Sequence, residues 1–218
     1  MNLTSIDGII GAGKAYLLGM LKYDNRFTGD LEGVGFIEEP VEKFQTYKSF
    51  NPLKEFYTNP KENAATCQLY FLDVMNETYT KHLSSQKHCY LTERNMYSTA
   101  VFTSTLFCEG MITDFQYEYI LDKVQERIKQ VLPPDCSLGC NRLIYLNTDT
   151  DTCLKRIQYR VEESHMEEMR HYLKSLQSEY EKYYTDFIET NGSDKAEQIT
   201  EEVFTDCTVE KIKELIKA

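Results

Sequence analysis

Short apolar runs alternate with longer stretches of helical periodicity along this chain. Five runs have the length and composition of β-strands, and they lie at Leu3 to Ile6, Gly33 to Glu38, Cys89 to Thr92, Arg142 to Leu146 and Gln198 to Phe204. Between them, apolar residues recur every three or four positions, which indicates helices near 13–23, 61–84, 96–109, 114–132, 150–161, 165–189 and 208–217. Strands that alternate with helices predict an α/β fold with a five-stranded parallel sheet flanked by helices.

No repeat, low-complexity tract or change of composition divides the 218 residues. The adjacent Pro133 and Pro134 end one predicted helix and lead into the fourth strand, so they mark a loop rather than a domain boundary. A chain of this length is long enough to bury a substantial core as one unit. We therefore expect a single domain over residues 1–218.

The net charge of -11 limits the classes of partner. A polymer of phosphates or an acidic membrane would be repelled, so we expect neither nucleic acid nor a membrane as partner, whereas a small phosphorylated ligand can bind at a local basic site. No apolar run approaches the roughly 18 residues of a membrane span. The seven cysteines are odd in number and form no CxxC pair, and no His lies close in sequence to Cys136 and Cys140. These features favour reduced packing thiols without zinc, in the cytoplasm.

An anion-binding loop follows the first predicted strand. Residues Gly8 to Ala15 read GIIGAGKA, a spacing in which glycines let successive backbone N–H groups converge while Lys14 reaches the outer phosphates of a nucleotide. The motif ends in Ala15, where a Ser or Thr hydroxyl that binds Mg²⁺ is expected. The alternative is a glycine-rich turn that joins strand to helix without a ligand.

Carboxylates end the second and third predicted strands, where ligands bind in open parallel sheets. Glu39 could accept the proton of a hydroxyl that attacks a γ-phosphate. Glu93 could hold Mg²⁺ through water, and Arg94 could neutralise charge on the transferred group. The alternatives are a carboxylate that precedes a turn-forming proline and a local ion pair at a strand end.

Two predicted helices carry further candidates. In the helix near 61–84, Gln68 interrupts an apolar stripe that includes Phe71 and Met75, so its amide either reads the edge of a base or caps a buried polar group. Arg156 and Arg160 lie four residues apart on one helix face, where they either clamp phosphates or pair with neighbouring glutamates.

In this order, the motifs resemble those of the deoxynucleoside kinases, a family of P-loop kinases that includes enzymes for thymidine and deoxycytidine. The resemblance runs from about residue 3 to 185. The segments that carry it are the phosphate loop, Glu39-Pro40-Val41-Glu42-Lys43, Tyr57, Gln68-Leu69-Tyr70, Glu93-Arg94 and Cys153 to Ser164.

The resemblance implies roles for the matched positions. The catalytic residues would be Glu39 as base, Arg94 and Lys14, with Glu93 as a Mg²⁺ ligand. ATP would be bound by Gly8, Gly11, Ala12, Gly13, Lys14, Ala15, Arg156 and Arg160, the last two in a short lid over about 156–166. The nucleoside would be bound by Phe44, Tyr57, Gln68, Phe71, Met75, Phe102 and Glu163, of which Tyr57 and Glu163 would hold the sugar 3′-hydroxyl.

The implied activity is transfer of a phosphoryl group from ATP, with Mg²⁺, to the 5′-hydroxyl of a deoxynucleoside. Relatives that prefer purines or cytidine carry Arg and Asp at the positions of Met75 and Thr99, so these residues favour a pyrimidine and, among pyrimidines, thymidine. The family resemblance also implies a homodimer whose small-molecule partners are a deoxynucleoside and a nucleotide.

Several positions depart from the family pattern. Ala15 lacks the Mg²⁺-binding hydroxyl, Asn95 replaces a Ser, and the lid is shorter by about two residues and lacks one arginine. The aromatic residue that stacks on the base aligns with Phe102 if one residue is missing nearby, and with Thr103 otherwise. These departures support a second hypothesis, a nucleotide- or nucleoside-binding pseudokinase with weak or no turnover. A third hypothesis is a nucleoside monophosphate kinase on a similar fold. It is less favoured, because Glu39 and Gln68 match the nucleoside site of the deoxynucleoside kinases better.

Overall fold

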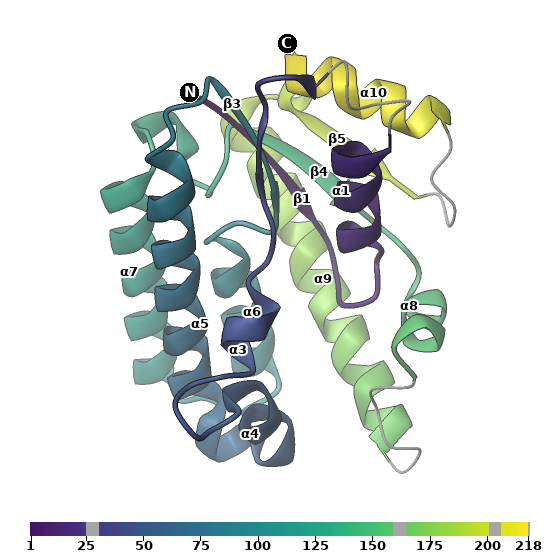
Figure 1. Ribbon diagram of the computed structural model, residues 1–218. Coiled ribbons are helices and arrows are strands. Elements are labelled where there is room, and N and C mark those ends of the chain that lie inside the picture. The colour runs from purple at the N-terminus through teal and green to yellow at the C-terminus, as the bar shows by residue number, and fades with distance from the viewer. Residues whose placement is uncertain (25–30, 159–164, 201–205, 218) are drawn as a thin grey trace.

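A single parallel sheet forms the centre of the molecule (Figure 1). The computed structural model describes residues 1–24, 31–158, 165–200 and 206–217. The sheet has the order β2-β3-β1-β4-β5. Its strands are β1 (Asn2–Asp7), β2 (Gly35–Ile37), β3 (Cys89–Glu93), β4 (Arg142–Leu146) and β5 (Ala196–Ile199). The predicted α/β class and the five-stranded parallel sheet are therefore confirmed.

Helices pack around this sheet, with α1 in front of it and α9 behind it in Figure 1. The longer helices match the predicted ranges closely, because each has an apolar stripe long enough to show its period. The helices are α1 (Lys14–Tyr23), α3 (Val41–Phe44), α4 (Pro52–Thr58), α5 (Pro60–Leu83), α6 (Ser98–Cys108), α7 (Asp114–Val131), α8 (Thr150–Ile157), α9 (Met166–Asn191) and α10 (Asp206–Lys217), with 3-10 turns η2 (Pro134–Cys136) and η5 (Ser193–Lys195).

Two short helices and one strand boundary differ from the sequence-based expectation. The helices α3 and α4 were not expected, because four and seven residues are too few to show a helical period. The last strand was expected at Gln198 to Phe204 but forms at Ala196–Ile199, where it pairs with β4. In this edge strand only Ile199 is buried, so an apolar run is a poor guide to its position; residues 201–205 lie outside the described part of the chain.

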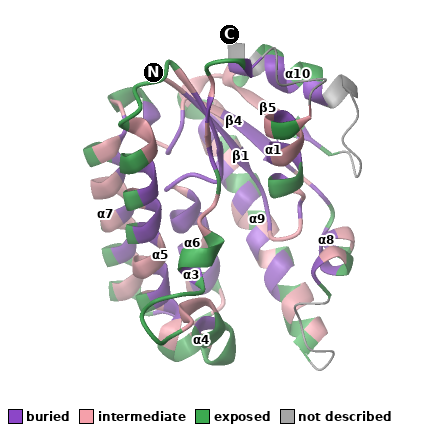
Figure 2. Cartoon of the chain, in the orientation of Figure 1, coloured by how far each residue is buried: buried purple, intermediate pink, exposed green. Residues whose placement is uncertain are grey.

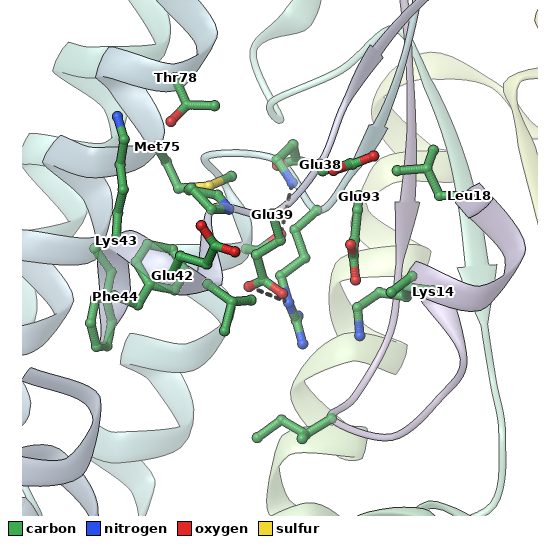
Figure 3. Close-up of a pocket in the computed structure, with 18 of the residues that line it drawn as sticks. Lys14, Leu18, Glu38, Glu39, Glu42, Lys43, Phe44, Met75, Thr78 and Glu93 are labelled. Atoms are coloured by element: carbon green, nitrogen blue, oxygen red, sulfur yellow. Dashed lines mark hydrogen bonds and ion pairs between the residues drawn. The ribbon is translucent and has the colours of Figure 1, made fainter. Parts of the chain in front are cut away.

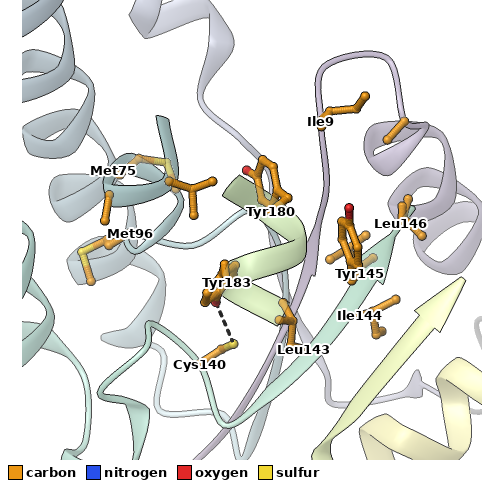
Figure 4. Close-up of a cluster of buried hydrophobic side chains, with 14 of the residues drawn as sticks. Ile9, Met75, Met96, Cys140, Leu143, Ile144, Tyr145, Leu146, Tyr180 and Tyr183 are labelled. Atoms are coloured by element: carbon orange, nitrogen blue, oxygen red, sulfur yellow. Dashed lines mark hydrogen bonds between the residues drawn. The ribbon is translucent and has the colours of Figure 1, made fainter. Parts of the chain in front are cut away.

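The central strands are buried on both faces, as Figure 2 shows for β1 and β4, whereas α3 and α4 lie at the exposed end of the molecule. Figure 4 shows part of the core beside β4, where Tyr145 stacks on Tyr180 of α9 with ring centroids 6.2 Å apart. Among the helices of the described residues, none combines the length and the apolar composition that a membrane span requires.

Strand order brings the candidate residues together. The strand β1 lies between β3 and β4, with Ile6 in register with Glu93 on one side and with Ile144 on the other. All strands run parallel, so the segment that follows β1 and the carboxylates that end β2 and β3 meet at one edge of the sheet. Such an edge, where neighbouring connections leave in opposite directions, is where open α/β sheets bind ligands.

Candidate active site

The loop between β1 and α1 has the backbone conformation that its glycines permit. Gly8, Gly11 and Gly13 have φ values of 145°, 85° and 102°. A Cβ atom would lie 2.6 Å from the carbonyl oxygen of Leu146 at Gly8 and 2.6 Å from that of Cys153 at Gly11. Conformation disfavours a side chain at all three positions, and lack of space also excludes one at Gly8 and Gly11, so the backbone can surround a small anion.

Lys14, the first residue of α1, is buried at this loop. Its ammonium donates hydrogen bonds to the carbonyl oxygens of Gly8 at 3.1 Å and Ile9 at 2.8 Å. Burial lowers the pKa of Lys14 to about 8, and the positive charge of Arg94 acts in the same direction. The loop therefore holds a cation that favours an added negative charge, because an anionic ligand would stabilise the protonated ammonium.

Arg94, directly after β3, lies at the centre of the site. It has a left-handed backbone conformation, with φ of 59°, and its N–H donates to the carbonyl oxygen of Ile6 at 2.9 Å. Its Nε lies 3.0 Å from Oε1 of Glu39, an ion pair without the alignment of a hydrogen bond. The guanidinium also lies over the ring of Phe102, 4.8 Å from the centroid, so charge and packing both orient it.

Asp7, the last residue of β1, anchors Arg94 from the interior. Asp7 is not among the site residues expected from the sequence. Its carboxylate is fully buried, 3.8 Å from the Arg94 guanidinium. It accepts hydrogen bonds from the hydroxyls of Ser5 at 3.0 Å, Ser98 at 2.9 Å and Tyr180 at 3.0 Å, and from the Asn95 amide at 3.1 Å. Burial nevertheless raises the pKa of Asp7, and Arg94 opposes that rise. The available sequence signal was a single acid between a buried strand and the glycine loop.

Tyr180 connects these two charges. Its hydroxyl donates to Asp7 Oδ1 and accepts a hydrogen bond from NH1 of Arg94. Asp7 and Tyr180 are separated by 173 residues in sequence, so only the packing of α9 against the sheet brings them together.

Asn95, the residue after Arg94, is held by hydrogen bonds and by close contact with a glycine. Its amide donates to the hydroxyls of Ser5 at 3.0 Å and Tyr183 at 3.1 Å, and its oxygen accepts from the Tyr97 N–H at 2.7 Å. A Cβ at Gly139 would lie only 2.2 Å from this oxygen. The loop that contains Gly139 can approach Asn95 closely because position 139 has no side chain.

Glu93 is the candidate Mg²⁺ ligand. Its carboxylate is nearly buried; burial raises its pKa, and the negative charge of Glu39 raises it further. A cation beside these two acids would relieve their repulsion, which fits a metal at this position. No group of three or more His, Cys, Asp or Glu side chains able to hold a metal occurs in the described ranges. Phosphate oxygens and water would therefore complete the coordination, as is usual for Mg²⁺ at phosphate sites.

A cavity of about 1160 Å³ joins the glycine loop to α3, α4 and the face of α5 from Gln68 to His82. Figure 3 shows Glu39, Glu93 and Lys14 turned toward the same space, with Phe44 and Met75 on its far side. The described candidates that line it are Gly11, Gly13, Lys14, Ala15, Glu39, Phe44, Tyr57, Gln68, Phe71, Met75, Glu93, Arg94, Phe102 and Arg156.

The part of the cavity beyond Glu39 is aromatic. The rings of Phe44 and Phe71 lie 4.7 Å apart. Phe102 also lines the cavity, beneath the Arg94 guanidinium, whereas Thr103 is fully buried and its hydroxyl donates to the carbonyl oxygen of Thr99 at 2.7 Å. The structure therefore places Phe102, and not Thr103, where it can contact a ligand.

The lid candidates fall partly outside the described residues. Arg156, in α8, donates from NH1 to the carbonyl oxygens of Gly11 and Ala12, at 3.2 Å each. Arg160 and Glu163 lie in the segment 159–164, which the structure does not describe. Ala12, within the loop, is fully buried and does not line the cavity, so it contributes to loop packing.

Together these groups can carry out an acid–base and electrostatic reaction on a phosphate. Glu39 offers a carboxylate at the cavity wall, while Lys14 and Arg94 present positive charge beside it. A hydroxyl group bound near Glu39 would face a phosphate bound at the loop, which is the arrangement that phosphoryl transfer requires.

Comparison with known proteins agrees with this chemistry. The family model described as deoxynucleoside kinase matches residues 4–218. A fowlpox virus protein named "Probable deoxycytidine kinase" is 26% identical over 183 residues, which cover 84% of this chain and 71% of the viral one. A deoxyguanosine kinase from Dictyostelium discoideum is 28% identical over 193 residues, covering 86% of this chain and 60% of that one. Human mitochondrial thymidine kinase 2 is 22% identical over 179 residues, which cover 82% of this chain and 62% of the human one. The chain thus spans about 60% of the length of the last two relatives.

Solved structures share the fold. Deoxyadenosine kinase from M. mycoides with bound dCTP superposes with a TM-score of 0.70 and 19% identity, over 99% of this chain and 98% of that one. The same enzyme with the products dCMP and dCDP gives a TM-score of 0.73 at 18% identity, with the same coverage.

Proposed function

This chain belongs to the deoxynucleoside kinase family, and we propose that it transfers the γ-phosphoryl group of ATP to the 5′-hydroxyl of a pyrimidine deoxynucleoside, with thymidine preferred. Members of this family are phosphotransferases. The observation that carries the proposal is the Glu39–Arg94 ion pair, at 3.0 Å, in the same cavity as the glycine loop and Lys14. It supplies a proton acceptor and positive charge on one wall.

In the proposed reaction, Glu39 accepts the proton of the 5′-hydroxyl as the new O5′–Pγ bond forms and the bond from Pγ to the β-phosphate oxygen breaks. Arg94 keeps the Glu39 carboxylate oriented and stabilises negative charge on the transferred group, and Lys14 with the loop N–H groups holds the phosphates. Glu93 would hold Mg²⁺ beside the phosphates, and the ion when bound would supply charge neutralisation at the phosphate oxygens.

The preference for a pyrimidine rests on the aromatic part of the cavity. Gln68 and Met75 of α5 are buried there beside the packed rings of Phe44 and Phe71. The Gln68 amide can donate to and accept from the edge of one base, and Phe71 narrows the space for a larger one. Met75 and Thr99 supply no charge that would bind a purine or a cytosine amino group.

A second candidate function is supported by Ala15. This residue lines the cavity at the second position of α1 but has no hydroxyl to ligate Mg²⁺. A protein with this site could bind nucleotide or nucleoside with little turnover. The two candidates share a fold and a ligand class, and they differ in product formation.

One experiment separates them. Purified protein is incubated with Mg-ATP and each of the four natural deoxynucleosides, and monophosphate formation is followed with radiolabelled nucleoside beside an authentic kinase. Product from thymidine or deoxycytidine supports the enzyme. Thermal stabilisation by a nucleoside without product supports the binding protein, and neither product nor stabilisation rejects both.

A further inference from the structure

One polar group in the cavity wall has no partner within the protein. Tyr172, in α9, lines the cavity and is 9% exposed, and its hydroxyl oxygen is buried without a hydrogen bond to any described residue. Buried hydroxyls are nearly always paired, and an unpaired one costs about 1–3 kcal/mol. A hydroxyl that is kept here despite this cost indicates a hydrogen-bond partner from outside the protein, such as a ligand.

Other buried tyrosines of this chain have paired hydroxyls. Tyr79 donates to Thr92 at 2.8 Å, Tyr180 donates to Asp7 at 3.0 Å, and Tyr183 donates to the carbonyl oxygen of Leu138 at 2.9 Å. None of these three residues lines the cavity. Packing in this fold thus satisfies the buried hydroxyls of the interior, and the unpaired one occurs where a ligand can reach it.

The surroundings of Tyr172 indicate which part of a ligand it faces. Tyr57 and Arg94 line the same cavity as Tyr172, and the electrostatic fields of Tyr57, Arg94 and Glu109 reach its hydroxyl. Burial raises the pKa of Tyr172 above its ordinary value, so the phenol remains a hydrogen-bond donor at neutral pH. The hydroxyl therefore belongs to the wall shared by Arg94, at the reacting end, and Tyr57, the proposed sugar-binding residue.

We propose that Tyr172 is a further substrate-binding residue, whose hydroxyl donates a hydrogen bond to the 3′-hydroxyl oxygen of the deoxynucleoside sugar. The proposal rests on the proposed function. Tyr172 reaches the sugar from α9, whereas Tyr57 reaches it from α4, so the two would hold the sugar from different elements of the fold. Substrate binding would then satisfy the one buried hydroxyl described here that the protein leaves unpaired.

The test compares Tyr172→Phe with wild-type protein. Unliganded Y172F should be at least as stable as wild type, because the change removes an unpaired buried hydroxyl and keeps the ring. The Kd of the best-bound natural deoxynucleoside should rise about 3- to 10-fold, the worth of one neutral hydrogen bond. The 3′-deoxy analogue of that nucleoside should bind Y172F and wild type equally. Stability is measured by thermal shift, and each Kd by isothermal titration.

Tyr145→Phe is the matched control. Its hydroxyl donates to Asn147 at 3.3 Å and lies outside the cavity wall, so its removal should leave every nucleoside Kd unchanged. Equal binding of the natural nucleoside by Y172F and wild type would overturn the inference. So would a Y172F defect that persists with the 3′-deoxy analogue, or a clear loss of stability in unliganded Y172F. Failure of wild type to bind any deoxynucleoside would instead reject the proposed function.

Discussion

Removing the Tyr180 hydroxyl tests the buried network behind the cavity wall that carries Arg94 and Glu39. In the wild-type protein this hydroxyl donates to Asp7 Oδ1 at 3.0 Å and accepts from Arg94 NH1. Tyr180→Phe keeps the ring that packs against Tyr145 but deletes both hydrogen bonds. Asp7 and Arg94 would keep their 3.8 Å contact, and Arg94 would keep its ion pair with Glu39.

The expected loss of stability follows from the charge of the partners. A hydrogen bond to a charged group contributes about 1.5–3 kcal/mol, and both partners here are charged and buried. Loss of the two bonds should therefore cost about 3–6 kcal/mol. For a chain of 218 residues, each kcal/mol corresponds to roughly 2–4 °C, so Tm should fall by about 6–24 °C. Because Arg94 loses one of the groups that orient it, kcat should also fall by about tenfold or more, with a smaller change in the nucleoside KM.

The pH dependence distinguishes this network from simple packing. Burial raises the pKa of Asp7, so the folded protein binds its proton more tightly than the unfolded chain, and the contribution of Asp7 to stability falls as pH rises through the folded pKa. Loss of the Tyr180 donor should raise that pKa further. The Tm difference between Y180F and wild type should therefore be larger at pH 7.5 than at pH 5.

Thermal unfolding at the two pH values and steady-state kinetics provide the measurements, with Tyr145→Phe as control. Tyr145 belongs to the same aromatic cluster, but its hydroxyl donates to the neutral Asn147, so its change should cost about 1 kcal/mol or less. Equal effects of Y180F and Y145F on Tm, or a Y180F deficit that does not change with pH, would refute the role assigned to the Asp7–Tyr180–Arg94 network.

Three further predictions address other parts of the site. Ala15→Ser should raise kcat by up to about 100-fold and lower the Mg²⁺ concentration needed, because it supplies the missing ligand; unchanged kinetics across a Mg²⁺ titration would show that the hydroxyl does not limit turnover. The kcat/KM for ATP should fall above about pH 8, because the free Lys14 ammonium has a pKa of about 8 and loses its charge as pH rises; a flat profile from pH 7 to 9.5 would contradict this. Gly139→Ala should destabilise the protein by about 1–3 kcal/mol in denaturant unfolding, because a Cβ would lie 2.2 Å from Asn95 Oδ1 and the φ of 86° disfavours Ala. Adding Asn95→Ser should recover part of that loss, and additive effects would rule out the contact as its cause.

Local features of the chain could be predicted from sequence because their causes are local. The glycine loop needs only Gly8, Gly11, Gly13 and Lys14 at fixed spacing, and the long helices and inner strands display their own periods. The helices α3 and α4 were too short for this, and the edge strand β5 has too little buried surface. Placement of Glu39, Glu93 and Arg94 on one wall required one additional step, the rule that ligands bind at the carboxyl edge of a parallel sheet.

The sequence by itself determined the α/β class, the glycine-rich loop after the first strand and the order of motifs that indicates a nucleoside kinase. Only the tertiary structure decided which residues surround Arg94. It placed Asp7 and Tyr180, 173 residues apart, in one hydrogen bond, fitted Gly139 against Asn95, turned Phe102 rather than Thr103 into the cavity, and left the Tyr172 hydroxyl without a partner. These contacts depend on how α6 and α9 pack against the sheet. Burial then determines their energetics, because it makes each charge and hydroxyl depend on partners that are distant in sequence.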